Sequence, residues 1–202
     1  MKIKKTITIP IFGGLIFGAI SYLTTVADLT IQITDDIFLG PWEIFNILSA
    51  GLFGPIGLLI TELGLDISGY VYLIRGVFPE PQGIYYMMSN YIAHYIALLP
   101  VVFGYRFIYQ RIRMPRLLAG WALIVSIFYL LGIVFSVILH NIAVPGLGVS
   151  YNDYLNNSVL VEYVLVTIIT LLIVLALPER YRRPQWFEPK NAPHQNFESP
   201  DD

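Results

Sequence analysis

Cysteine is absent from this chain of 202 residues, which excludes disulfides, thiolate metal sites and cysteine nucleophiles. Charged residues are scarce, at 13% of the sequence, whereas soluble domains carry about a quarter. The sequence has no Gly-rich phosphate loop, no zinc-binding pair of histidines on one helix turn and no serine elbow. We therefore expect no catalytic residue, no cofactor and no metal, so the chain is not predicted to be an enzyme.

A basic stripe is also missing. The formal net charge is −2, from 12 Lys and Arg against 14 Asp and Glu. Proteins that bind nucleic acid gather basic side chains on one surface, so nucleic acid is excluded as a partner. Apolar residues are abundant instead, at 56% of the chain, and the mean hydropathy is +0.66. This composition indicates a protein embedded in the lipid bilayer.

Apolar runs of membrane-spanning length alternate with polar gaps over residues 1–178. About 20 helical residues cross a 30 Å hydrocarbon core, so we expect one all-α, polytopic domain built as a six-transmembrane-helix bundle. The expected spans are 7–26, 42–53, 56–74, 83–105, 117–139 and 158–177. Residues 179–202, with four prolines and no apolar period, are predicted to form a disordered cytoplasmic tail.

The second expected span is short. It stops at Gly54-Pro55-Ile56-Gly57, a sequence that breaks helices. A dozen residues at 1.5 Å each cannot cross the membrane core. We therefore expect this helix to be tilted, broken or buried among its neighbours.

Basic residues mark every second gap between the apolar runs. They precede the first run, follow the fourth over 106–116 and follow the sixth over 180–183, and Arg75 is the exception among the other gaps. Cytoplasmic loops retain positive charge. The pattern predicts a multi-pass protein of the cell membrane with both termini in the cytoplasm.

Polar side chains within these spans gather at one depth. Each is costly in lipid unless it faces protein or water, and several lie near the outer ends of different spans. We predict that they line a pocket open to the outside; the alternative is that they are interfacial residues touching water and headgroups. Besides Glu43, Asn46 and Tyr residues at the same level, the candidate binding residues are Asn90, His94, His140, Asn141, Glu162 and Tyr163.

Glu62 and Asp66 stand apart from this group. Four residues apart, they share a helix face near mid-membrane with no Lys or Arg at that depth. Such a pair binds a cation, relays protons, or stays protonated and hydrogen-bonded to neighbouring helices. The sequence leaves these roles open.

Small residues form a stripe on the first span. Gly14 and Gly18 begin the stripe, and Ser21 and Thr25 continue it. Small residues let another helix approach closely. The stripe is interpreted either as a docking surface for a partner helix or as packing within the bundle.

The predicted arrangement resembles the substrate-binding S component of energy-coupling factor (ECF) vitamin transporters. The shared features are six spans, cytoplasmic termini, a small-residue stripe on the first span, a long first outer loop and the turn Leu52-Phe53-Gly54-Pro55-Ile56-Gly57. The resemblance covers roughly residues 7–178. The family's Ala-xxx-Ala stripe is replaced here by Gly14 and Gly18.

The resemblance implies a binding protein that holds a vitamin or related small molecule in its outward half. Trp42 and the Asp35-Asp36 loop would form a lid over the site. The acidic and aromatic lining suits a cationic or nitrogen-heterocyclic ligand. The implied partners are an ECF transmembrane coupling subunit and ABC-type ATPases, with Gly14 and Gly18 as the docking surface. Two alternatives remain open, a scaffold resembling MreD-type cell-shape proteins and the membrane sensor region of a signalling protein.

Overall fold

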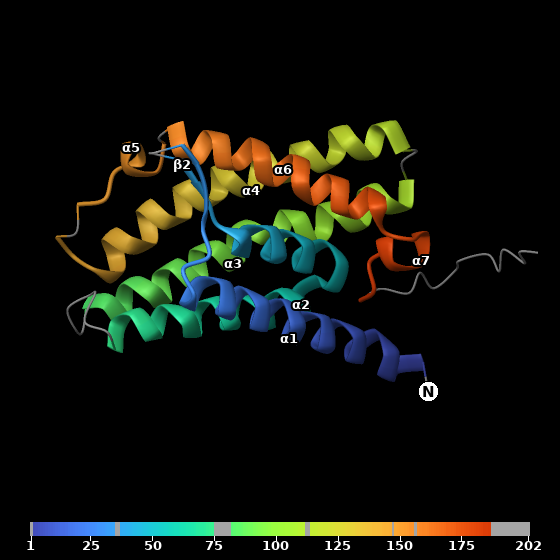
Figure 1. Cartoon of the computed structure of the whole chain (residues 1–202), viewed down its shortest axis with the longest axis horizontal. Coiled ribbons are helices and arrows are strands. Elements are labelled where there is room, and N and C mark those ends of the chain that lie inside the picture. The colour runs from blue at the N-terminus through green and yellow to red at the C-terminus, as the bar shows by residue number, and fades with distance from the viewer. Residues whose placement is uncertain are drawn as a thin grey trace, which may run out of the picture.

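The computed structural model describes residues 2–34, 37–74, 82–111, 114–146, 148–155 and 157–186. Long helices run roughly along one axis, and a β-hairpin and short helices lie toward the ends (Figure 1). In chain order the elements are α1 (Lys2–Val26), β1 (Ile31–Thr34), β2 (Ile37–Leu39), α2 (Pro41–Ile74), α3 (Gln82–Arg111), α4 (Met114–Ala143), α5 (Tyr151–Tyr154), α6 (Asn157–Ala176) and α7 (Glu179–Arg182).

Five helices among the described residues are long and apolar enough to cross a membrane. Their apolar stretches are 7–26, 41–71, 83–109, 119–143 and 159–176. The prediction of a multi-pass helical membrane protein is confirmed by these stretches, which also account for association with the bilayer. The second and third expected spans both lie within α2, where a non-helical residue separates two helical segments.

The chain folds back on itself inside α2. Gly54 has φ 68° and ψ −157°, values outside the helical region, and Pro55 follows it. The hydroxyl groups of Ser49 and Thr61 are hydrogen-bonded at 2.8 Å, although twelve residues along a straight helix would separate them by about 18 Å. Residues 41–53 and 55–74 therefore form two antiparallel arms (Figure 1). The expected helix break at Gly54-Pro55 is confirmed.

The first arm of α2 lies at the centre of the bundle. Residues 46–52 of this arm are all buried, and an 18-residue apolar segment of α2 is 61% buried, against 22% to 39% for such segments in the other four helices. Its residues Ile47, Leu48 and Ala50 join the apolar core together with side chains of α3, α4 and α6. Burial among neighbours, expected for this short segment, is what the structure shows.

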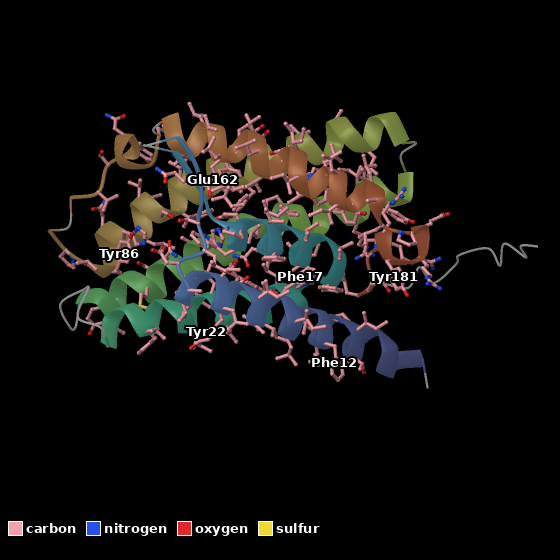
Figure 2. The ribbon with its side chains drawn as sticks, in the orientation of Figure 1. Phe12, Phe17, Tyr22, Tyr86, Glu162 and Tyr181 are labelled. Carbon is pink, nitrogen blue, oxygen red and sulfur yellow. The ribbon has the colours of Figure 1, made fainter. Side chains whose placement is uncertain are left out.

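The glycine stripe of α1 packs against the second arm of α2. A Cβ atom added at Gly14 would lie 2.7 Å from the carbonyl oxygen of Gly57, and one at Gly18 would lie 2.9 Å from that of Ile60. Both glycines are buried. This corrects their assignment as a partner-docking surface, because α2 already occupies the stripe. The exposed side of α1 carries large apolar residues instead, among them Phe12 (Figure 2).

The segment after α6 returns to the tip of the α2 hairpin. The Gln185 backbone N–H donates to the carbonyl oxygen of Leu52 (2.7 Å), and the Trp186 ring covers Gly54. The Tyr105 hydroxyl donates to the carbonyl oxygen of Arg182 (2.6 Å). The predicted disordered tail therefore does not begin at residue 179: residues 179–186 are structured, and 187–202 lie outside the described residues.

The packing of α1 generates the first testable prediction. Replacing Gly18 with Leu should destabilise the folded protein, by about 2 kcal/mol or more, because the new side chain collides with α2 backbone. Ala19→Leu is the matched control, since Ala19 is exposed and its side chain has room. Thermal melting of the two purified variants in detergent measures the difference. Equal melting temperatures would show that the α1–α2 contact is not close.

Candidate functional site

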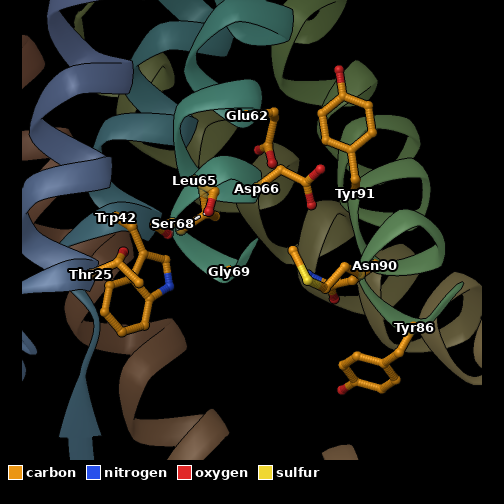
Figure 3. Close-up of a pocket in the computed structure, with 11 residues that line it drawn as sticks. Thr25, Trp42, Glu62, Leu65, Asp66, Ser68, Gly69, Tyr86, Asn90 and Tyr91 are labelled. Atoms are coloured by element: carbon orange, nitrogen blue, oxygen red, sulfur yellow. Dashed lines mark hydrogen bonds between the residues drawn. The ribbon is translucent and has the colours of Figure 1, made fainter. Parts of the chain in front are cut away.

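A cavity of about 260 Å³ opens between the end of α1, the two arms of α2 and the first turns of α3. Its lining is acidic and aromatic, and no Lys or Arg of the described residues contributes to it. Figure 3 shows the two carboxylates of α2 between Trp42 on one side and Tyr91 on the other. The lining residues are Thr25, Trp42, Glu62, Leu65, Asp66, Ser68, Gly69, Tyr86, Met87, Asn90 and Tyr91.

The hairpin in α2 explains why these residues meet. Trp42 lies in the first turn of the first arm, and the reversal at Gly54 brings the second arm back past it. Antiparallel arms that pair Ser49 with Thr61 place residue 42 level with residues 66–68. Glu62 and Asp66, four residues apart, face the same side of the second arm. The cavity thus depends on two segments separated by the Gly54 turn.

Beside the cavity, which Glu62 also lines, His94 joins one buried and one mostly buried carboxylate. Its Nδ1 lies 2.8 Å from Glu62 Oε1, and its Nε2 lies 3.2 Å from Glu43 Oε1. Glu62 is 2% exposed, and the side chains of His94 and Glu43 are 15% and 17% exposed. The edge of the imidazole also meets the Phe128 ring of α4 at a centroid distance of 5.3 Å. We call Glu43, His94 and Glu62 the bridge, because it connects both arms of α2 to α3.

The bridge and the cavity together carry an excess of acidic groups. They contain the carboxylates of Glu43, Glu62 and Asp66 against the single imidazole of His94, and the ion pairs found among the described residues are the two that His94 forms. Charges in the bilayer interior are costly unless they are paired. The site therefore attracts positive charge.

Some polar atoms near the bridge have no partner within the described residues. Glu43 Oε2 is buried and accepts no hydrogen bond there, and both amide atoms of the fully buried Asn46 are in the same situation. Asn46 lies three residues after Glu43, on the same helix face. Buried polar groups are normally hydrogen-bonded, so these atoms mark places where water or a ligand atom would be held.

The structure divides the residues that the sequence had placed in one pocket. Trp42 and Asn90 line the cavity, and His94 lies beside it. His140 does not line it, but its ring stacks on Tyr86, which does, at a centroid distance of 4.2 Å. The Asp35-Asp36 part of the expected lid lies outside the described residues.

Three further candidates have structural contacts away from the cavity. The Asn141 side chain donates to the Val149 carbonyl (2.8 Å) and accepts from its N–H (3.0 Å), which fixes the loop after α4. Glu162 accepts a hydrogen bond from the Gly40 N–H (3.2 Å), where β2 leads into α2 (Figure 2). The Tyr163 hydroxyl lies 2.6 Å from Ser126 Oγ, beside a different, mainly apolar cavity of about 210 Å³.

Glu62 and Asp66 line the cavity, although the sequence analysis had set them apart from the pocket. Their acidic spacing was recognised, but depth along separate spans did not show that they lie beside Trp42 and Asn90. The Gly54-Pro55 turn was the available signal. A tight reversal there aligns the two arms and places residue 62 close to the outer half of the first arm.

Comparisons with protein-family models, with curated proteins and with solved structures gave no match for this chain. The resemblance to S components therefore depends on the sequence features described above. The chain is a multi-span helical membrane protein.

The bridge generates a second prediction. His94→Ala should destabilise the protein by about 3 kcal/mol or more, because it leaves one buried and one mostly buried carboxylate without their shared partner. Adding Glu43→Gln to His94→Ala should recover part of the loss, since it removes one of the two facing charges. Melting temperatures of the parent, both single variants and the double variant give the coupling. A double variant no more stable than His94→Ala alone would contradict the charge argument.

Proposed function

We propose that this chain is a membrane-embedded substrate-binding subunit, similar in role to an ECF S component, which captures a small cationic molecule from outside the cell. The observation that carries the proposal is the cavity in which Glu62 and Asp66 lie between aromatic side chains with no basic residue in the lining. Energy for uptake would come from an ECF coupling subunit and ABC-type ATPases. The chain itself contains no phosphate loop.

The lining supports the class of ligand. Carboxylates attract a positive group by charge, and the faces of Trp42 and Tyr91 add cation–π attraction. A volume of about 260 Å³ is just below the usual range for small-molecule sites, about 300–1,000 Å³. The site therefore suits a compact cationic or nitrogen-heterocyclic molecule, in keeping with a vitamin or a related compound.

The proposed docking surface differs from the one predicted from the sequence. Gly14 and Gly18 face α2, so a coupling subunit would meet the opposite side of α1. Phe12, Ile16 and Leu23 are 63%, 57% and 61% exposed there. Lipid or a partner helix covers such a face in the membrane, and the resemblance favours the partner.

The ligand proposal is tested with the purified protein by native mass spectrometry for a retained small molecule. Asp66→Asn and Trp42→Ala should each lower occupancy, corresponding to about tenfold weaker binding or more, because each removes an attraction to a cation. Tyr163→Phe is the matched control, since Tyr163 lines a different cavity. Loss of ligand in Tyr163→Phe, but not in the other two variants, would move the site to the α4–α6 side.

Topology is tested by reporter fusions. We expect the 112–113 connection and the end of α7 to be cytoplasmic, because basic residues flank them. Fusions near residues 35 and 152 should be outside, which requires the α2 hairpin to begin and end on the outer side of the membrane. If the 112–113 connection proves external, both the six-span model and capture from outside are wrong.

A further inference from the structure

The two hydrogen bonds of His94 fix the charge of the bridge. An ionised carboxylate only accepts, so each of the two contacts needs a proton between nitrogen and oxygen. Two arrangements satisfy this condition: an imidazolium between two carboxylates, or a neutral imidazole with one carboxylate and one carboxylic acid. Both arrangements give the three side chains a net charge of −1, so the charge of the bridge does not depend on where the protons lie.

No positive side chain of the described residues compensates this charge. The titratable groups that face the bridge are Asp66 on α2, Tyr91 on α3, Tyr129 on α4 and Glu162 on α6. Glu162 already accepts the Gly40 N–H, and none of these groups is a base that would carry a positive charge. Glu43 Oε2 is buried without a hydrogen-bond partner in this part of the chain. The empty bridge is therefore an unpaired negative charge inside the bilayer.

We infer that one proton and one monovalent cation are alternative occupants of this site. The inference rests on the proposed function and adds to it the ligand's charge and the linkage of its binding to pH. In the empty protein a third proton binds a carboxylate oxygen of the bridge and makes it neutral. A cation entering the cavity beside Glu62 supplies the same charge, and the proton then leaves to solvent. Each bound cation thus releases one proton, and the charge of the bridge is balanced both before and after binding.

The Glu62→Gln variant separates this role from a purely structural one. The amide oxygen that the substitution introduces can accept from His94 Nδ1, while Nε2 donates to Glu43 Oε1. An imidazolium, one carboxylate and one amide have no net charge and keep both hydrogen bonds. The variant should then be stable without a third proton. A bridge that served packing alone would gain nothing from losing the charge of Glu62.

The ligand-free measurement compares melting temperatures of the parent and Glu62→Gln in detergent from about pH 5 to about pH 8. The parent loses its third proton as pH rises, so its stability relative to Glu62→Gln should fall with rising pH. The comparison with the variant cancels the titrations of groups that do not face Glu62, and making both measurements in an Asp66→Asn background removes the titration of Asp66, which does face it. A constant difference across this range would overturn the inference without any ligand.

The second measurement uses benzyltrimethylammonium, whose fixed charge cannot titrate. At the acidic end of the pH range, where the third proton is bound before the cation, calorimetry in buffers of different ionisation enthalpy should show about one proton released per cation bound. The affinity there should rise about tenfold per pH unit. Glu62→Gln should bind at least tenfold more weakly and release no proton. Binding to the parent without proton release overturns the inference and leaves the proposed function standing. Failure to bind at every pH counts against cation capture itself. The melting data then still test whether the bridge binds a third proton.

Discussion

The reversal at Gly54 is the constraint on which the rest of the structure depends. Only a residue without a side chain adopts φ 68° easily while the Trp186 ring lies where a Cβ would be. The turn also leaves the Leu52 carbonyl without its helical donor, and the Gln185 N–H takes that place. One glycine thus determines the antiparallel arms of α2 and the position of the segment after α6.

The lipid environment explains why some polar groups inside the bundle are paired by side chains from other helical segments. Ser49 and Thr61 link the two arms, and the Trp121 Nε1–H donates to Thr170 across α4 and α6 at 3.0 Å. In hydrocarbon no water replaces a lost partner. Such pairs hold the helices in register, and the buried acids of the bridge stand out because their charge is not balanced in the same way.

The sequence predicts the membrane class, the long apolar helices and the break at Gly54, because hydropathy and helix-breaking residues act locally. It does not predict which faces meet. Gly14 and Gly18 were recognised as a surface for close approach, but whether α2 or a partner fills it depends on packing in three dimensions. The 179–186 segment was missed for a similar reason: its order comes from contacts with Leu52, Gly54 and Tyr105, and not from its own composition.

The predicted site shows the same division between local and non-local information. Depth along each helix grouped Asn90, His94, His140 and Glu162 at one level, but rotation about each helix axis decides which of them face a common space. Glu62 was assigned to a separate pair because it was expected near mid-membrane, at a different depth from the other candidates. The antiparallel arms place it 2.8 Å from His94. The cavity and the bridge therefore share Glu62, and any group that binds in the cavity acts directly on the charge that joins α2 to α3.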